Sequence, residues 1–511
     1  MTIVAISMMR SAMVSRPVIS RSIQIRLSAF KVGPGCEPDK VFELGPGVFG
    51  GAPDGRLWPI LAKAKLRTLH GTHASVKFVT LMPHWMTLAF LTALALHLLV
   101  QLWLSYRQTR HVAARRHEVP PAFADAVSAA EHAKAADYTV ARQRLGRLEL
   151  GYDTIVLLVL TLGGGIAALG RLATAIAGQN PIGSGTLHVL LALLAMSLAT
   201  LPFSVWRTFV LEARFGFNRT TAAVFVADLL KGAVLGGLLG GSIVALVLWT
   251  MAASGTRWWL VAWAVWTAIS LLLLWAWPRW IAGFFNKFTP LTDAALRERI
   301  DALLARCDFH ARDVYVMDGS KRSAHGNAYF TGLGREKRIV FYDTLLQSLS
   351  PVQVEAVLAH ELAHFKLRHI PQRLLVSAAT SLAGFALLGW LSAQDWFYAA
   401  LGVDRPGNSA ALLLFILVLP AFTWLLTPLG AAWSRRHEFQ ADAFAARFSD
   451  GPELGRALVR LYRENASTLT PDPLHSAFYD SHPPPVVRIS RLAHPGGTQG
   501  SPATGQAFSP T

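Results

Sequence analysis

Cysteine and charged residues are both scarce in this 511-residue chain. The two cysteines, Cys36 and Cys307, are far apart and match neither a disulfide framework nor a metal-binding spacing. Only 15% of the residues are charged and 52% are hydrophobic, which excludes an ordinary soluble protein. No continuous apolar core of signal-peptide length is found near the N-terminus. The hydrophobic excess must therefore lie in lipid.

Apolar runs long enough to cross a bilayer, about 17 to 25 residues each, recur along the chain. They lie at 86–104, 154–170, 187–206, 232–251, 257–277, 374–392 and 409–428. This pattern predicts an all-α polytopic membrane protein with about seven transmembrane helices.

The formal net charge of +17 does not indicate a nucleic-acid-binding protein. The basic residues are scattered among the loops between the apolar runs, without an aromatic-interleaved patch or a recognised binding motif. We expect no nucleic-acid partner, and we interpret the charge as an orientation signal.

The loops predicted to share one side of the membrane hold eleven Lys and Arg, eight in 105–153 and three in 207–221. The alternate short loops between spans hold only two. By the positive-inside tendency, the basic side is cytoplasmic. The segments 278–373 and 429–492 are then both cytoplasmic, although two spans separate them.

Residues 1–85 conflict with this topology, because they hold eleven Lys and Arg yet would lie outside. Their Pro, Gly and Ser content predicts an irregular extension. A translation start at Met82 or Met86 would remove the conflict, and N-terminal sequencing of the native protein would test it. Residues 493–511 have the composition of a disordered tail.

The predicted domain organisation follows from these segments. The successive parts are an irregular extension (1–85), five spans (86–277), a cytoplasmic catalytic segment (278–373), two spans (374–428), a second catalytic segment (429–492) and the tail (493–511).

The sequence His360-Glu361-Leu362-Ala363-His364 has the HExxH pattern, in which two histidines face the same side of a helix. Ser350 and Gln353 form a capping box, with Pro351 in the first turn, and so predict where this helix begins. Both imidazoles can then reach one Zn²⁺ at about 2.0 to 2.1 Å. Glu361 would take a proton from the attacking water.

A catalytic zinc site uses three protein ligands and leaves one position open, so a third ligand is needed. On a continuing helix His369 would face away from the metal, and the metzincin glycine turn is missing. His437 is possible but has no partner. We choose Glu438, because Asp442 follows one turn later and could orient a ligand histidine. The alternative for Asp442 is an ion pair with a nearby arginine.

Five segments resemble the integral-membrane gluzincin peptidases typified by the CAAX prenyl protease 1 family. They are RFGFNRTT (214–221), GSKRSAHGNAYFTGLGREKRIVFYDTLL (319–346), HELAHFKLRHI (360–370), SRRHEFQADAFA (434–445) and SHPPPVVRI (481–489). The likeness runs from about residue 86 to 492 and departs at Gly326 and Ala363, where other small residues are frequent. It implies seven spans around a chamber, a cytoplasm-facing site with one Zn²⁺ per chain, and Glu438 as third ligand.

His482 precedes Pro483 to Pro485, and Arg488 follows six residues after the histidine. A proline segment restricts the backbone and so fixes the position of its neighbours. The resemblance implies that His482 and Arg488 stabilise the developing oxyanion. The alternative is a histidine in an extended linker.

Asn327 and Ala328 precede the β-branched and aromatic run 338–342, which predicts a small β-hairpin. A substrate peptide could pair with its exposed edge and lie extended over the metal. The alternative is that the hairpin only packs against the HExxH helix. Asp228 and Lys231, near the end of the fourth span, could pair with each other or line a wet chamber.

We therefore predict a membrane zinc metalloendopeptidase that acts in a lipid bilayer on a peptide or membrane protein, whether prenylated or not. Eleven Lys against thirty-seven Arg (48 − 11) favour a GC-rich, bacterial genome and thus the inner membrane, with the site facing the cytoplasm. General turnover of membrane proteins is then an alternative substrate class. A zinc-clasped transporter or channel is a remote alternative, since a structural site needs a fourth ligand. The sequence does not indicate an oligomeric state.

Overall fold

The seven predicted spans correspond to six long apolar helices and one bent pair of helices. They belong to a computed structural model that describes residues 84–311, 313–322, 324–331 and 338–493, so nearly all of the predicted extension and tail lie outside the described residues. The long helices are Trp85–Ala114, Pro181–Glu212, Ala222–Ala253, Gly255–Ala276, His369–Leu391 and Asn408–Phe448. The polytopic α-helical fold is confirmed.

The membrane part is built from twelve helices of the described chain. They are α2 (Trp85–Ala114), α3 (Ala129–Leu160), α4 (Gly165–Ala177), α5 (Pro181–Trp206), α6 (Ala222–Leu235), α7 (Gly241–Ala253), α8 (Trp258–Ala276), α12 (His369–Leu391), α13 (Asp395–Ala399), α14 (Asn408–Val418), α15 (Pro420–Thr423) and α16 (Thr427–Phe448). Short π or 3₁₀ turns lie at Pro121–Phe123, Arg207–Glu212, Gly236–Gly240, Gly255–Arg257, Trp277–Ile281, Ala282–Phe284 and Trp424–Leu426. Phe90, Ile166 and Leu414 are fully buried among these helices.

The second predicted span, 154–170, is not one continuous helix. Its two halves, α3 and α4, are bent by 58° at a short break. Gly164 has φ of +73°, a conformation that L-residues with a side chain rarely adopt. A Cβ on Gly163 would lie 2.6 Å from the carbonyl oxygen of Val159. The glycine run therefore permits a break that hydropathy alone did not reveal.

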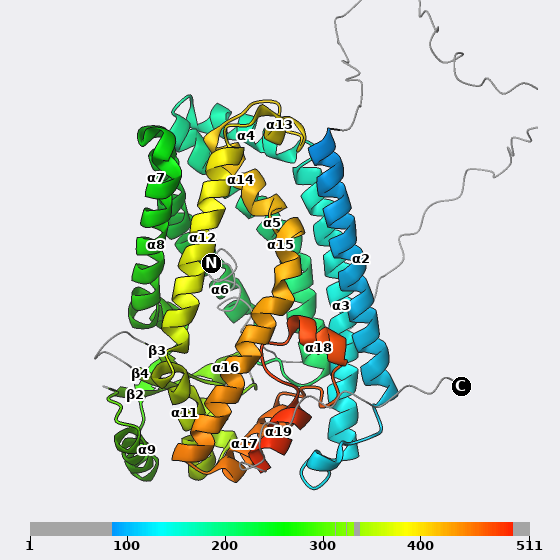
Figure 1. Ribbon diagram of the computed structural model, residues 1–511, viewed down its shortest axis with the longest axis vertical. Helices are drawn as coiled ribbons and strands as arrows, with labels where there is room; N and C mark the ends of the chain where they lie inside the picture. Colours follow the sequence, from blue (N-terminus) through cyan, green and yellow to red (C-terminus); the bar gives the residue numbers. More distant parts are fainter. Residues whose placement is uncertain (1–83, 312, 323, 332–337, 494–511) are drawn as a thin grey trace, which may run out of the picture. The chain divides into compact units, whose positions relative to one another are not determined.

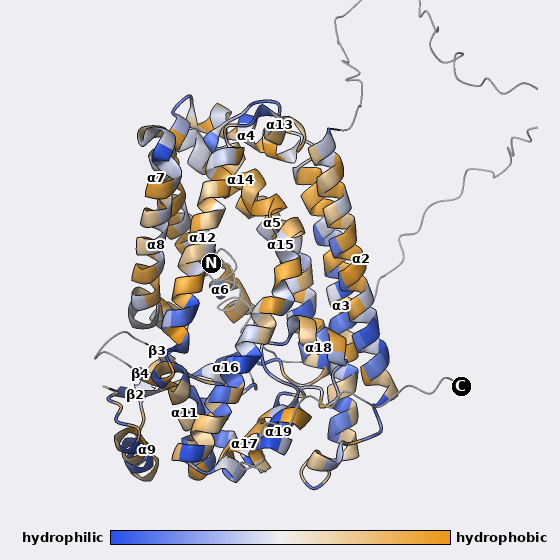
Figure 2. Cartoon of the chain, in the orientation of Figure 1, coloured by the Kyte–Doolittle hydropathy of each residue, from blue (hydrophilic) through white to orange (hydrophobic). Residues whose placement is uncertain are grey.

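The two ends of the long helices differ in polarity. The short helices α4 and α13 lie at one end, and the elements around α11 and α17 lie at the other (Figure 1). Apolar residues follow the long helices, whereas hydrophilic residues gather at the end with α11 and α17 (Figure 2). The arginine-rich halves of α2 and α3 also reach this end (Figure 1), which agrees with the predicted convergence of 278–373 and 429–492.

The end with α11 and α17, named the catalytic end here because it holds both segments predicted to be catalytic, contains a four-stranded mixed sheet rather than a lone hairpin. Its elements are β1 (Phe288–Pro290), α9 (Ala294–Arg306), β2 (Asp313–Met317), a 3₁₀ turn (Gly319–Lys321), β3 (Ala328–Thr331), β4 (Arg338–Tyr342), α10 (Asp343–Ser348), α11 (Pro351–Lys366), α17 (Gly451–Glu464), α18 (Pro473–Tyr479) and α19 (Pro485–Ala493). The strand order is β1-β2-β4-β3. The hairpin β3–β4 is antiparallel, as predicted, but β2 pairs in parallel with β4, and β1 extends the sheet. The predicted hairpin is therefore part of a larger sheet, and the sequence did not indicate β1 and β2.

A buried ion pair connects the sheet segment to the membrane helices. The guanidinium of Arg322 donates to both carboxylate oxygens of Asp228, on α6, at 2.9 and 3.0 Å. Arg322 also donates to the side chain of Asn286 at 2.7 Å. Lys231 donates instead to the carbonyl of Phe284. Asp228 and Lys231 thus do not pair with each other: Lys231 binds the connection between α8 and the sheet, and Asp228 binds an arginine between β2 and β3.

We expect Asp228→Ala to lower the free energy of unfolding by about 3 to 5 kcal/mol, because it leaves the buried charge of Arg322 unpaired. The measurement is the midpoint of thermal denaturation in detergent. Asp137→Ala is the control, since it removes an exposed pair with Arg116 and surface pairs contribute little. Equal midpoints for the two variants would contradict this role of the buried pair.

Candidate metal centre

Helix α11 presents His360 and His364 from the buried core of the catalytic end. It begins at the predicted capping box, where the Ser350 hydroxyl accepts from the amide of Gln353 at 3.4 Å. The Gln353 side chain accepts from the Ser350 amide at 3.2 Å. This reciprocal cap satisfies two of the free N–H groups at the helix start. The predicted start of the HExxH helix is confirmed.

Helix α16 packs against α11 and brings Glu438 to the two histidines. Glu438 Oε2 lies 3.4 Å from Nε2 of His360, and Oε1 lies 3.7 Å from Nε2 of His364. Ligand atoms bound tetrahedrally to one Zn²⁺ at about 2.0 to 2.1 Å are about 3.3 Å apart. The three side chains therefore have the spacing that one metal ion requires, and among the described residues they form the single such group.

The electrostatics of the site also suit a cation. Glu438 is 4% exposed, and its Oε2 has long contacts with three nitrogens, at 3.4 Å to His360, 3.4 Å to His482 and 3.9 Å to Arg488. Burial disfavours a charge on His360, but hydrogen bonds to Asp442 and Glu438 outweigh it and raise its pKa to about 9. The two carboxylates that stabilise a proton on His360 also stabilise a metal cation at the same place. Two nitrogens and one carboxylate oxygen are a common donor set for catalytic zinc.

Asp442 and Arg488 hold the ring of His360. Asp442 Oδ1 lies 2.9 Å from Nδ1 of His360 and accepts its proton, which leaves Nε2 free to face the metal. Arg488 on α19 donates to both oxygens of Asp442, at 2.9 and 2.6 Å. All three side chains are more than nine-tenths buried. The arrangement restricts His360 to one tautomer and one orientation.

His369 is not in the ligand group, as predicted, but it contacts His364, because the helix does not continue through residue 369 as was assumed. Its Nδ1 lies 3.0 Å from Nδ1 of His364, and its Nε2 lies 3.0 Å from Oε1 of Gln440. If His364 donates to His369 and His369 donates to Gln440, Nε2 of His364 stays free for the metal. Burial, followed by the charge of His360, lowers the pKa of His364 to about 3, which keeps that ligand neutral.

A break in the helix explains why His369 turns back. Helix α11 ends at Lys366, and Arg368 has φ of +58°, after which α12 begins at His369. Pro371 was the available signal, because proline is tolerated in a first turn but not in a helix interior. The third candidate, His437, is not a ligand: its ring stacks on that of His369 with centroids 3.9 Å apart.

Glu361 lies beside the ligands but binds none of the described residues through its carboxylate. It is half-buried. Burial raises the pKa of Glu361 above its ordinary value, the charge of His360 opposes the shift, and Glu438 adds to it. A carboxylate with a raised pKa and no fixed partner can accept a proton and release it again.

His482 and Arg488 reach the centre in different ways. Nε2 of His482 lies 3.4 Å from Glu438 Oε2, and the His482 side chain is 62% exposed. Arg488 is buried, and its Nη1 lies 3.9 Å from Glu438 Oε2 while its other nitrogens bind Asp442. Arg435, which the sequence did not single out, donates to the carbonyls of Ser476, Ala477 and Asp480 and so ties α18 to α16.

Asn327 and Ala328 lie at the start of β3, an edge strand that packs against α11. The carbonyl of Asn327 accepts from the amide of Tyr342, and Ala328 pairs with Phe341. Only one edge of β3 is paired with a strand among the described residues. The site therefore has a β-strand edge next to the HExxH helix.

Comparisons with known proteins point to one family. A family model described as "CAAX prenyl protease N-terminal, five membrane helices" matches residues 108–287, and "Peptidase family M48" matches residues 290–495. The CAAX prenyl protease 1 homolog of Homo sapiens is 31% identical, over 77% of this chain and 93% of its own length. That of Oryza sativa subsp. japonica is 39% identical, over 58% of this chain and 70% of its own length.

A solved structure has the same fold. The crystal structure of S. mikatae Ste24p matches with a TM-score of 0.74 and 29% sequence identity, covering 80% of this chain and 98% of that chain. The match includes both the membrane helices and the catalytic end.

We expect His369→Ala to weaken zinc binding about 10- to 100-fold, because His364 loses the acceptor that orients it. His369→Gln should restore part of the affinity, since its amide can accept from His364 and donate to Gln440. The measurement is zinc affinity in competition with a chelating dye. His188→Ala is the control, because His188 is a buried, hydrogen-bonded histidine of α5 bound to Ser409 and Ile166. Unchanged affinity in His369→Ala would contradict the role.

Proposed function

This chain belongs to the CAAX prenyl protease 1 family of M48 membrane zinc metallopeptidases, and we propose that it is an endopeptidase that cleaves prenylated protein C-termini. The observation that carries the proposal is a group of three ligands, the buried His360 and Glu438 and the half-buried His364, with the carboxylate of Glu361 beside it. We further propose that one Zn²⁺ binds per chain.

Three ligands, rather than four, favour a catalytic site over a structural one. A structural zinc is closed by four protein ligands, whereas catalytic zinc keeps one position for water or substrate. No fourth His, Cys, Asp or Glu joins the ligand group among the described residues. This argues against the transporter or channel with a zinc clasp, which would need a closed site.

Glu361 acts as the general base and acid in this proposal. When bound, zinc supplies a Lewis acid that polarises a carbonyl and lowers the pKa of water to about 7. Glu361 takes a proton from the attacking water and returns it to the leaving amine. The raised pKa of Glu361 supports this exchange, because it brings the carboxyl closer to neutral pH.

His482 and Arg488 have separate roles in the proposal. His482 is exposed beside Glu438, so its Nε2–H can donate to the oxyanion that develops at the attacked carbonyl. Arg488 was expected to share this task, but two of its nitrogens are bound to Asp442. We assign Arg488 to holding Asp442, which in turn orients His360.

The edge of β3 that pairs with no described strand, starting at Asn327 and Ala328, is the proposed place for the substrate backbone. A peptide that adds to a strand edge is held extended by main-chain hydrogen bonds, without a fixed sequence. Because β3 packs against α11, such a peptide would lie near the metal.

The family shows that the chain lies in a membrane, and we propose which side of that membrane the site faces. The chain is an integral membrane protein. We propose that the site faces the cytoplasm, on the basis of the arginine-rich loops. The relatives named above are eukaryotic, so the expected bacterial inner membrane gains no support from them.

We expect Glu361→Gln to lower proteolysis by at least about 10²- to 10⁴-fold, because the water loses its base. Zinc content should stay unchanged, since Glu361 is not a ligand. Glu438→Gln is the contrasting variant and should lose zinc as well as activity. Full activity of Glu361→Gln would refute the assignment, and cleavage that survives removal of the metal by a chelator would refute the metallopeptidase mechanism.

We expect a prenylated C-terminal peptide to be cleaved with a higher kcat/KM than the same peptide without its prenyl group. The prenyl chain adds apolar binding energy that the unmodified peptide lacks. The comparison uses both peptides and a misfolded membrane protein, each with and without chelator. Chelator-sensitive cleavage of the misfolded protein alone would favour general turnover of membrane proteins and contradict the prenyl preference.

A further inference from the structure

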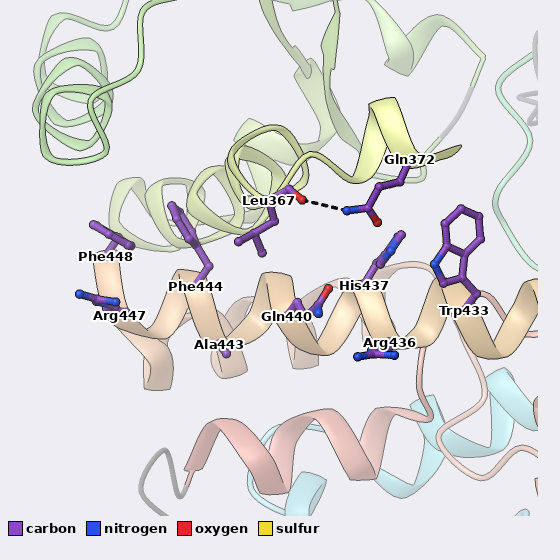
Figure 3. A pocket seen from close by; sticks show the side chains of 10 residues that line it. All are labelled: Leu367, Gln372, Trp433, Arg436, His437, Gln440, Ala443, Phe444, Arg447 and Phe448. Carbon is purple, nitrogen blue, oxygen red and sulfur yellow. Dashed lines mark hydrogen bonds between the residues drawn. The ribbon is translucent and has the colours of Figure 1, made fainter. Parts of the chain in front are cut away.

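A groove of about 660 Å³ runs along α16 beside the corner where α11 ends and α12 begins. Figure 3 shows side chains from both elements around it. Those that matter here are Gln372, Trp433, Arg436, His437, Gln440 and Arg447. We call this the α16 groove. It lies on the opposite side of His369 from the metal ligands, so it is separate from the active site.

The α16 groove is cationic and amphipathic. Arg436, Gln440, Ala443 and Arg447 recur at the spacing of one helix face and are all exposed. The neighbouring face carries the aromatic residues Trp433, Phe444 and Phe448. None of the described residues that line the groove is acidic. Neither Arg436 nor Arg447 forms an ion pair with a described residue, so an anionic ligand would meet two available guanidinium groups.

The Trp433 end of the groove lies just beyond the hydrocarbon core predicted from the apolar runs, whereas Arg447 lies about 28 Å beyond residue 428 along the helix. The last apolar run ends at residue 428, so Trp433 and Arg436 lie about 8 and 12 Å further along the helix axis. Gln372 lies two residues before the apolar run 374–392. Head groups occupy the outer part of a bilayer, next to the hydrocarbon core. Tryptophan is enriched at this level, and basic pockets between spans bind anionic lipids there.

Two residues of the groove connect it to the metal ligands. Gln440 accepts from His369, which in turn contacts His364. His437 stacks on His369, is 3% exposed, and has no hydrogen-bond partner for Nδ1 among the described residues. A ligand that orders this face of α16 would therefore also order the partner of His364.

We propose that the α16 groove binds the head group of an anionic membrane glycerophospholipid. The phosphate lies against Arg436 and the acyl chain begins at Trp433, while Arg447 extends the positive surface toward solvent. Bound lipid restrains Gln440 and His437 and thereby strengthens zinc binding through His369 and His364. The lipid site itself does not require the proposed peptidase function; only an effect on cleavage rate would rest on it.

The test compares the full chain in nanodiscs of phosphatidylcholine with nanodiscs that also contain phosphatidylglycerol. Lipid retained after purification is identified by mass spectrometry, and zinc affinity is measured in both preparations. The variant is Arg436→Ala with Arg447→Ala. Its matched control is Arg456→Ala with Arg460→Ala, which removes the same charge from exposed positions on α17.

We expect the groove variant to bind phosphatidylglycerol about fivefold more weakly, equivalent to about 1 kcal/mol for Arg436, because Arg447 lies too far beyond the apolar run to reach a head group. Wild type should bind zinc more tightly with phosphatidylglycerol present, and the groove variant should not. Equal losses in the groove and control variants would overturn the proposal, because they would mean a general charge effect. Displacement of the lipid by free glycerol 3-phosphate at similar concentration would also overturn it, in favour of a soluble anion.

Failure of the lipid site and failure of the proposed peptidase function give different results in these measurements. If no peptide is cleaved in either lipid mixture while lipid retention still depends on Arg436, the groove stands and the peptidase proposal fails. If cleavage depends on zinc but lipid retention is the same in all variants, the peptidase proposal stands and the groove fails.

Discussion

The site depends on one buried carboxylate, that of Glu438, at the crossing of α11 and α16. A buried carboxylate is costly unless positive charge compensates it. His360 and His364 face it from α11, and Arg488 approaches from α19. Helices α11 and α16 are separated along the chain by the last two spans, so those spans must return the chain to the same membrane side before the site can form. Folding of the membrane part and assembly of the site are thus coupled.

The two histidine ligands are supported by different chemistry. His360 contacts the charged side chain of Asp442, which is itself bound by Arg488. His364 instead contacts the uncharged side chain of His369, which is bound to Gln440. A carboxylate partner increases the basicity of an imidazole more than a neutral partner does. His360 is therefore the stronger donor. His364 depends on contacts that reach the exposed face of α16, and this makes it the ligand open to influence from outside the site.

Features set by local composition could be predicted, and features set by distant contacts could not. Apolar runs located the spans, and the capping box located the start of α11, because both depend on neighbouring residues. The strands β1 and β2 have three and five residues, and β2 pairs with β4 across a long connection. Such pairing leaves little local trace, so only the hairpin was expected. The break before His369 had a local signal in Pro371, but the HExxH helix was extended through it.

The roles of His482 and Arg488 show what sequence reasoning alone could not decide. Both residues lie near Glu438, as the motif indicated, yet only the structure shows which atoms of each are available. Nη1 of Arg488 does not bind Asp442 but lies against Glu438, and turning Nε or Nη2 toward an oxyanion would break the buried pair at a cost of about 3 to 5 kcal/mol. One oxyanion donor contributes about 2.7 to 4 kcal/mol, so that exchange brings no net gain. His482 is largely exposed, and its 3.4 Å contact with Glu438 is longer than a good hydrogen bond, so the proposal gives the oxyanion to His482 while Arg488 stays with Asp442.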